Sequence, residues 1–500
     1  MIPVIDLFAG PGGLNEGFSS VRALNGDAVF RTVGSYEMER AATDTLTLRA
    51  AIHRASEHGD EGAYYRFLRD EIPFSALTDD PRFGRALRDA ANHVHRIELS
   101  ESTRAEYAAS IRASLSGVLK GGDPWVLIGG PPCQAYSLVG RARRTHDREF
   151  EQDKKHFLYR EYLHIISEFR PPVFVMENVK GLLSSTHGGT GMFARILSDL
   201  KRPASDLRYN VVSLTVEGDS DALEPSDFII RSEQFGVPQA RHRVILLGIR
   251  SDVQFNSGGP SRLRRSEAVT VGDALHSMPM LRSGISRSFD DDFAWHGLRD
   301  AFAAAAREDG IDSQPFDDRA LSRGKRFMPS GTVMLAGSKG GYGSFVHDSR
   351  IGGVVQHATR AHMVTDLERY YFAASFARQN RRSPKLGDFP GRLLPNHRNA
   401  TAAMRPFEDR FRVQLSAKPS STIVSHMAKD GHYFIHPDPS QMRSLTVREA
   451  ARLQSFPDNY FFMGTRTQQY TQVGNAVPPY LAHQIARIVA GLFGAAVSFP

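Results

Sequence analysis

Short apolar runs alternate with amphipathic segments along the first 250 residues. Ile2–Leu7 and Ala28–Tyr36 have the length and composition of strands, and Leu14–Leu24 between them has the spacing of a helix. The same pattern predicts strands at Trp125–Ile128, Val173–Met176, Asn210–Val216 and Arg243–Ile249, and helices at Phe157–Glu168 and Met192–Leu200. We therefore predict an α/β fold with a doubly wound sheet, begun by a β-α-β unit with parallel strands.

Two stretches depart from this alternation. Residues 41–120 are mostly helical by pattern and exceed the length of a crossover connection, so a helical insertion is expected near residues 50–95. Residues 251–439 are loop-rich, and one clear helix is expected there, at Thr365–Arg378. Helical patterns return at Thr446–Leu453, with Thr446 as the N-cap, and at Pro479–Phe493. The prediction is one domain from residues 1–250 and 440–500, and a smaller irregular domain from residues 251–439.

The composition is that of a globular protein, with 41% hydrophobic and 23% charged residues. It excludes collagenous, coiled-coil and wholly disordered chains. The sequence contains no apolar run long enough for a membrane span, and its first residues lack the features of a signal peptide. Lysine and arginine exceed aspartate and glutamate by seven, which is compatible with a nucleic-acid partner.

Cys133 is the single cysteine among 500 residues. An intramolecular disulfide and zinc sites that need several cysteines are therefore excluded. This usage is typical of a cytosolic protein. A lone cysteine is most often a small buried apolar residue, so a chemical role needs support from its surroundings.

A glycine-rich turn follows the first strand and opens the first helix. Gly10, Gly12 and Gly13 would let a ligand approach the backbone closely, and Glu37 ends the second strand where it could bind ribose hydroxyls. A plain tight turn between strand and helix is the alternative interpretation. The spacing does not separate a dinucleotide from another adenosyl cofactor.

Further reactive side chains follow other predicted strands. Cys133 lies just after Trp125–Ile128, and Glu177 and Asn178 end Val173–Met176. The carboxyl ends of strands are where α/β sheets hold ligands, so these residues are candidate nucleophile and general acid. Arg241 and Arg243 would share one face of an extended segment and could clamp an anion or a carbonyl, unless they form a solvated edge.

Six segments together resemble the ordered motifs of the DNA (cytosine-5) methyltransferases. They are Asp6-Leu-Phe-Ala-Gly-Pro-Gly-Gly13, Gly130-Pro-Pro-Cys-Gln134, Glu177-Asn-Val179, Gln239-Ala-Arg-His-Arg243, Arg443-Ser-Leu-Thr-Val-Arg-Glu449 and Gln472-Val-Gly-Asn-Ala-Val-Pro-Pro479. The resemblance covers about residues 1–48, 97–250 and 440–495, and is much weaker over 49–96 and 251–420. It implies an S-adenosylmethionine-dependent, Rossmann-like catalytic domain and a target-recognition domain at residues 251–439.

The resemblance also implies covalent catalysis at C5 of a cytosine. The Cys133 thiolate would attack C6, and Glu177 would protonate or hydrogen-bond N3. Asn178 would support the loop and the base, while Arg241 and Arg243 would hold O2 and a neighbouring phosphate. The expected methyl donor is S-adenosylmethionine, with S-adenosylhomocysteine as product. Its expected contacts are Phe8, Ala9, Gly10, Gly12, Gly13, Leu14, Glu37, Met38, Glu98, Pro132, Leu158, Asn475 and Ala476.

Double-stranded DNA is the substrate that the resemblance implies. The target base would have to be flipped out of the duplex, and residues 134–155 resemble the basic loop that closes over it. Residues 251–425 would read the base edges. The expected DNA contacts are Gln134, Ser137, Arg141, Gln239 and Thr422.

Two other functions on the same scaffold stay open, an RNA (tRNA) cytosine-5 methyltransferase and a non-catalytic DNA-binding relative. The large variable region disfavours the first, and the intact Cys133, Glu177, Arg241 and Arg243 disfavour the second. No metal is expected, because the histidines of residues 357–436 are irregularly spaced. We expect a monomer in the cytoplasm, of bacterial modification type, with pairing to a restriction endonuclease as a further expectation.

Overall fold

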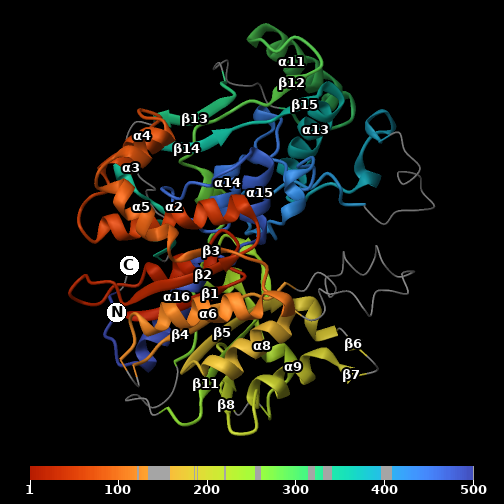
Figure 1. Ribbon diagram of the computed structural model, residues 1–500. Coiled ribbons are helices and arrows are strands. Elements are labelled where there is room, and N and C mark those ends of the chain that lie inside the picture. Colours follow the sequence, from red (N-terminus) through yellow and green to blue (C-terminus); the bar gives the residue numbers. More distant parts are fainter. Residues whose placement is uncertain are drawn as a thin grey trace.

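A central sheet and its covering helices form the lower half of the molecule in Figure 1. The structure is a computed structural model. It describes residues 1–120, 123–132, 158–184, 186–187, 190–218, 221–253, 261–313, 321–329, 341–395 and 408–498. The sheet has eight described strands, β1 (Ile2–Leu7), β2 (Phe30–Glu37), β3 (Val94–Arg96), β4 (Val126–Gly129), β5 (Val173–Val179), β8 (Tyr209–Val212), β9 (Ile229–Arg231) and β11 (His242–Arg250).

The strand order is β3-β2-β1-β4-β5-β11-β8, with β9 paired to β11. Neighbours from β3 to β5 are parallel, and β11 runs antiparallel to β5, β8 and β9. The predicted doubly wound α/β fold is confirmed. The reversal at β11 was not expected from the pattern, because a fully buried strand has the same composition in either direction.

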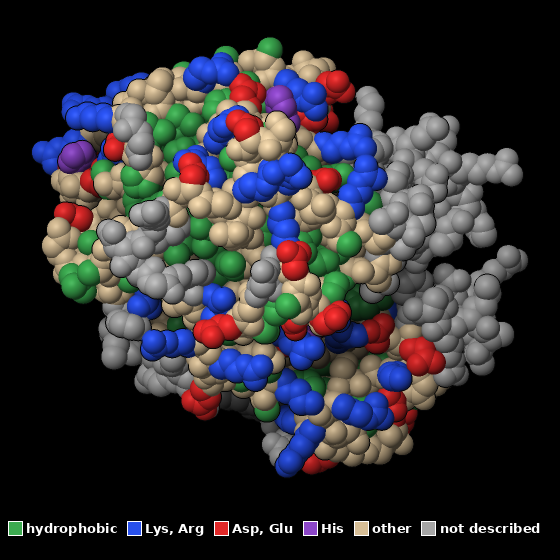
Figure 2. All heavy atoms as spheres, turned by 90° about the horizontal axis from the view of Figure 1, so that it is seen from below, with side chains coloured by type: hydrophobic (Ala, Val, Ile, Leu, Met, Phe, Trp, Pro, Cys, Tyr) green, Lys and Arg blue, Asp and Glu red, His purple; other side chains and the backbone are tan. Residues whose placement is uncertain are grey.

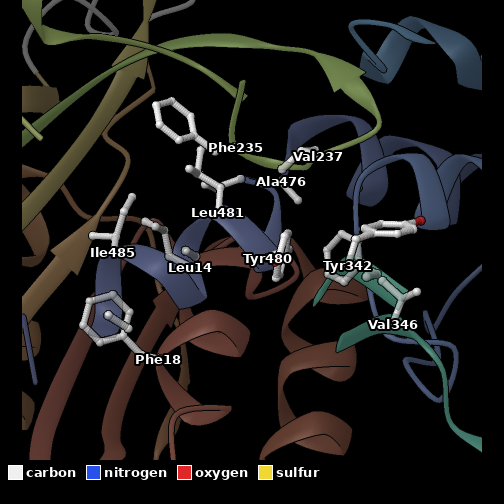
Figure 3. Packing of buried hydrophobic residues seen from close by; sticks show 14 of the residues in the cluster. Leu14, Phe18, Phe235, Val237, Tyr342, Val346, Ala476, Tyr480, Leu481 and Ile485 are labelled. Atoms are coloured by element: carbon white, nitrogen blue, oxygen red, sulfur yellow. The ribbon is translucent and has the colours of Figure 1, made fainter. Parts of the chain in front are cut away.

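Alternating side chains cover the two faces of the sheet. Val4 of β1 packs on one face, in a cluster with α1 (Gly13–Ser19) and α16 (Pro479–Leu492), and Figure 3 shows Leu14 and Phe18 against Leu481 and Ile485. Ile5 packs on the opposite face with α6 (Arg104–Ser116), α8 (Leu158–Phe169) and α9 (Met192–Lys201). The C-terminal helix therefore completes the fold begun by the first strand.

The remaining C-terminal helices are α14 (Val447–Leu453), which the sequence predicts, and α15 (Arg466–Asn475), which it does not. Thr446 caps α14 as predicted, since its hydroxyl accepts from the backbone of Glu449 while the Glu449 carboxylate accepts from the backbone of Thr446. By contrast, α1 ends at Ser19, although the apolar pattern continued to Leu24.

The expected insertion is a set of helices on the edge of the molecule. It contains the end of α2 (Arg40–Ser56), α3 (Gly62–Leu68), α4 (Phe74–Asp79) and α5 (Phe83–Ala91). Its core includes Tyr64 and Phe67 and is shared with Ile351, Val355 and Phe461. Figure 1 shows α3 and α4 beside the antiparallel strands β13 (Gly324–Pro329) and β14 (Gly353–Ala358).

Residues 251–439 are called the recognition segment after the prediction made from the sequence. Apart from β13 and β14, its described elements are α10 (Val271–Leu275), β12 (Gly284–Ser286), α11 (Asp292–Glu308), α12 (Tyr342–Val346), β15 (Ala361–Met363), α13 (Val364–Asn380) and β16 (Ser420–Ser421). Of these elements, β13, β14, α11 and α13 lie in the upper part of Figure 1. The helix expected at Thr365–Arg378 is α13. The proposed domain limits stay a prediction, and Val271 and Tyr342 pack in the same core cluster as Val4. No described helix has the length and apolar character of a membrane span.

Candidate active site

The glycine-rich turn leaves the sheet at the carboxyl end of β1. Its backbone has positive φ at Phe8, Gly10 and Gly12, with values of 52°, 57° and 90°. Gly12 precedes the first residue of α1, and the Ala9 amide donates to the Tyr36 carbonyl of the neighbouring strand at 3.1 Å. This hydrogen bond holds the turn beside the end of β2.

The three glycines of the turn are needed for different reasons. A Cβ atom at Gly10 would meet nothing within 4 Å, so the space above this residue is open. A Cβ at Gly12 would lie 2.7 Å from Leu46, and one at Gly13 would lie 2.2 Å from the Val477 carbonyl oxygen. Gly10 therefore leaves room for a ligand, whereas Gly12 and Gly13 permit close packing within the protein.

Glu37 lies at the end of β2 and is bonded to this turn. Its Oε2 accepts from the Gly10 amide at 2.8 Å, and its Oε1 accepts from the Glu39 amide at 2.8 Å. Burial raises the pKa of Glu37, although these backbone donors oppose the shift. Met38 beside it is exposed. Glu98 is also exposed and follows β3, which pairs with the end of β2, so it lies at the same edge of the sheet.

Asp6 is a further acidic residue at this edge, and its place within the apolar run Ile2–Leu7 does not mark it as a site residue in the sequence. It is 1% exposed, and its Oδ2 has no hydrogen-bond partner among the described residues. Burial and the nearby Glu37 raise the pKa of Asp6 well above its ordinary value. A buried polar atom without a partner is costly, so Asp6 and Glu37 would favour a ligand that carries hydrogen-bond donors or positive charge.

The other expected cofactor contacts differ in burial and in the element that carries them. Leu14 is buried in the core, Leu158 begins α8, and Pro132 is half-buried just after β4. Asn475 is the exposed last residue of α15. A Cβ at Gly13 would lie 3.2 Å from that of Ala476, which places the end of α15 against the turn.

A second cluster of polar side chains lies where β5 ends and β11 begins. The Nε of Arg243 is 2.7 Å from Oε1 of Glu177, and both side chains are largely buried. The antiparallel register pairs Arg243 with Val179, two residues beyond Glu177, so the two side chains leave the same face. A Cβ at Gly130 would lie 3.0 Å from Oε2 of Glu177, so this glycine gives the carboxylate its space.

Asn178 connects this cluster to the segment that leads to the cysteine. Its Nδ2 lies 3.5 Å from the Pro131 carbonyl oxygen, and its Oδ1 accepts from the Val179 amide at 2.8 Å. The parallel register of β4 and β5 pairs Gly129 with Met176, which brings the segment after β4 beside Glu177. Cys133 and the expected DNA contacts Gln134, Ser137 and Arg141 lie outside the described residues.

Arg241 has a different environment from the one that its spacing predicted. The chain leaves the sheet between β10 (Gln239–Ala240) and β11, and Arg241 turns into the protein. Its Nη1 donates to the carbonyls of Ile423 and Gly474 at 2.9 and 3.2 Å, and burial lowers its pKa. This argues against the expected contact with base or phosphate, because the guanidinium joins two protein segments.

Gln239 and Thr422, two of the expected DNA contacts, also bond to other parts of the protein. Gln239 is fully buried, accepts from the Ile423 amide at 2.8 Å and donates to the Leu453 carbonyl at 3.2 Å. The Thr422 hydroxyl donates to the Ala240 carbonyl at 2.7 Å, beside the parallel pairing of β10 and β16. These bonds occupy the Gln239 amide within the protein, and the DNA contacts expected of Gln239 and Thr422 stay predictions.

Other features of the described surface add little to this site. A cavity of about 740 Å³ lies behind the turn, lined by Gly12, Leu46 and Tyr460, but neither Asp6 nor Glu37 lines it. The face drawn in Figure 2 mixes basic and acidic side chains. No group of metal-ligating side chains occurs among the residues that the structure describes. The site therefore rests on the two clusters at the carboxyl edge of the sheet.

Comparison with known proteins identifies the family of this architecture. Residues 110–310 and 331–490 match the family model of the C-5 cytosine-specific DNA methylases. The Type II methyltransferase M.Bpa9945I of Bacillus paralicheniformis is 32% identical, over 97% of this chain and 98% of its own length. The DNA (cytosine-5-)-methyltransferase M.ApeKI of Aeropyrum pernix is 27% identical, over 75% of this chain and 83% of its own length.

A solved structure supports the same fold. It is a crystal structure named as a proposed DNA modification methyltransferase encoded within an E. coli prophage. It aligns with 99% of this chain and all of its own, at a TM-score of 0.52 and 19% identity.

Proposed function

The chain belongs to the C-5 cytosine-specific DNA methylase family and is a DNA (cytosine-5-)-methyltransferase, and on this premise we propose how it acts. The enzyme methylates C5 of a flipped-out cytosine within a specific sequence of double-stranded DNA. The observation that carries this proposal is the Glu177–Arg243 pair beside the segment that leads to Cys133, at the same sheet edge as the Gly10–Glu37 contact.

Cys133 is the proposed nucleophile of the reaction. Its thiolate forms a bond to C6, and the electron pair of the C5–C6 bond moves toward C5. Glu177 protonates or hydrogen-bonds N3, so the negative charge that develops on the base is stabilised. Arg243 holds the Glu177 carboxylate and is aimed at O2. After C5 is methylated, its proton leaves and the Sγ–C6 bond breaks, which restores the thiolate.

S-adenosylmethionine, when bound, supplies the electrophilic methyl group. The described residues fit this cofactor. Glu37 offers acceptors to the ribose hydroxyls, and Asp6 has a buried oxygen without a partner. The open space at Gly10 lets the ligand approach the turn, while Met38 is exposed beside Glu37 and Ala476 lies against Gly13.

The role of the protein in the cell is part of the same proposal. Relatives named as Type II methyltransferases support a place in a restriction-modification system, with a restriction endonuclease as functional partner. Base flipping, which costs a few kcal/mol, would be assisted by the basic residues of 134–155. The monomeric state and the cytoplasmic location stay predictions from the sequence.

Methyl transfer from tritiated S-adenosylmethionine tests the proposal. The full chain is incubated with duplex DNA or with tRNA, and Cys133→Ala is run in parallel. We expect label in DNA only, and none with the variant. Label in tRNA alone would overturn the DNA assignment. With the target known from bisulfite sequencing, duplexes carrying 5-fluorocytosine should trap a covalent adduct, because C5 then has no proton to lose.

A further inference from the structure

Three consecutive residues between α14 and α15 join separate parts of the molecule. Asn459, Tyr460 and Phe461 are all at least nine-tenths buried. Tyr460 contacts the glycine-rich turn, Asn459 contacts α2 and the recognition segment, and Phe461 contacts the insertion. We call residues 459–461 the junction.

Tyr460 reaches the turn between its two positive-φ glycines. Its hydroxyl donates to the Pro11 carbonyl. A Cβ at Gly12 would lie 3.2 Å from the hydroxyl oxygen of Tyr460. The ring is fixed by Phe456 and Phe462, with centroids 4.7 and 5.2 Å away. The packed ring therefore holds the Tyr460 hydroxyl against the turn.

Arg49 of α2 fixes the junction relative to α1. Its guanidinium lies 4.8 Å from the centre of the Tyr460 ring and donates to Oδ1 of Asn459 at 2.9 Å. It also pairs with Glu16 of α1 through Nε at 2.7 Å. Burial alone would raise the pKa of Glu16, but Arg49 and His53 hold it far below its ordinary value. The pair is therefore charged in the folded protein.

The insertion holds the junction from its other side. The Tyr64 hydroxyl donates to the Asn459 carbonyl at 2.6 Å, and Phe67 packs on Phe461 with centroids 4.9 Å apart. Asn459 also donates to Oδ2 of Asp348 at 2.7 Å. The helices that the family motifs do not cover are thus in direct contact with the residues that hold the turn.

We propose that Tyr460 is a positioning residue for the cofactor, through the Pro11 carbonyl, and that the insertion keeps Tyr460 in place. The proposal rests on the cofactor assignment made above. A turn with φ of +52° at Phe8 is strained, and a fixed donor at Pro11 keeps it in the conformation in which the Gly10 amide meets Glu37. Without that donor, part of the binding energy must restore this conformation.

Tyr460→Phe tests the proposal, because it removes the donor and keeps the ring. Binding of S-adenosylhomocysteine to the full chain is measured by calorimetry. We expect a Kd about 3- to 10-fold higher, the effect of one hydrogen bond. The KM for S-adenosylmethionine should rise by a similar factor, while kcat at saturating cofactor stays within about 2-fold.

Tyr342→Phe is the matched control. Tyr342 is fully buried, and its hydroxyl donates to the Arg452 carbonyl at 2.8 Å. Arg452 is not part of the glycine-rich turn. It should leave the Kd unchanged. Tyr64→Phe removes the bond from the insertion to Asn459 and should raise the Kd by about 2-fold, in the same direction.

The outcomes separate this proposal from the one it rests on. An unchanged Kd for Tyr460→Phe, or an equal loss in Tyr342→Phe, overturns the positioning role alone. A wild-type chain that binds no S-adenosylhomocysteine overturns the cofactor assignment as well. An unchanged Kd for Tyr64→Phe removes the insertion from the proposal and leaves Tyr460 in it.

Discussion

Buried carboxylates occur at the carboxyl edge of the sheet and between the sheet and the recognition segment, and their partners differ. Glu449 and Arg443 pair through two contacts of 2.6 Å, both about 1% exposed. Asp458 pairs with Arg452 at 2.8 Å. At the sheet edge, Asp6 has an oxygen without a partner among the described residues.

The difference separates carboxyl groups that hold the structure together from a carboxyl group that is open to a ligand. Burial alone would raise the pKa of Glu449, but Arg443 lowers it far below its ordinary value. For Asp6 nothing offsets burial, and its pKa is raised. Residue type does not distinguish Asp6 from Glu449 and Asp458, whereas the presence or absence of a buried arginine does. Glu177 lies at the same edge as Asp6 but is paired with Arg243.

Glu177→Gln should produce the largest effect at the sheet edge. It keeps the shape of the side chain but removes the acid, so methyl transfer in a single turnover should fall by about 10²- to 10⁴-fold. The melting temperature should fall by less than in Glu449→Gln, because Arg243 loses its charge partner but is less completely buried than Arg443. Glu168→Gln, at an exposed ion pair on α8, is the control and should retain full activity. A loss below about 5-fold for Glu177→Gln would remove it from the chemistry.

Glu449→Gln makes the corresponding change among the carboxylates that are paired with a buried arginine between the sheet and the recognition segment. It leaves Arg443 buried without its charge partner, so the free energy of unfolding should fall by about 3–5 kcal/mol in urea denaturation. Replacing both partners, Arg443→Met with Glu449→Leu, should recover much of this loss. A single variant as stable as the wild type would contradict the assigned structural role.

Arg241→Met tests two arginines that are two positions apart in one motif. It leaves the carbonyls of Ile423 and Gly474 without their buried donor, so stability should fall by about 1–3 kcal/mol. Activity per folded molecule should be kept within several-fold at low temperature. Arg243→Met should lose activity beyond its loss of stability, because Arg243 is paired with the proposed acid Glu177. Lost activity without lost stability in Arg241→Met would restore the role predicted from the sequence.

This pair of arginines shows how far the sequence predicts the site. The strand ends near Glu37 and Glu177 were predicted from the apolar runs that precede these residues, although β5 continues past Glu177 to Val179. Arg241 was misplaced because an alternating pattern assumes an unbroken strand, and the chain leaves the ladder there. The insertion was recognised as helical, but its pattern holds no information about Phe461, the distant residue that it covers.

The smallest expected effect is the dependence of stability on pH. Its sign for Asp6 is opposite to its sign for Glu449 and Asp458. The folded-state pKa of Asp6 is raised, so above about pH 3.9, its ordinary value, the folded protein binds more protons than the unfolded chain. Stability from this group is therefore present at low pH and is lost as pH rises through the raised pKa. Glu449 and Asp458, whose pKa values are lowered, contribute stability above about pH 4.3 and 3.9 respectively and lose it as pH falls further.

Asp6→Asn should remove the first contribution and leave the second. Urea denaturation without cofactor, at pH values from about 2 to 8, should show the variant gaining stability relative to the wild type as pH rises, because the asparagine cannot ionise. The acid limb set by Glu449 and Asp458 should be the same in both proteins. The variant should also bind S-adenosylhomocysteine more weakly, since the open acceptor is gone. A stability difference that does not depend on pH would mean that Asp6 has a partner in solution, and the contrast between the two sets of carboxylates would then fail at this residue.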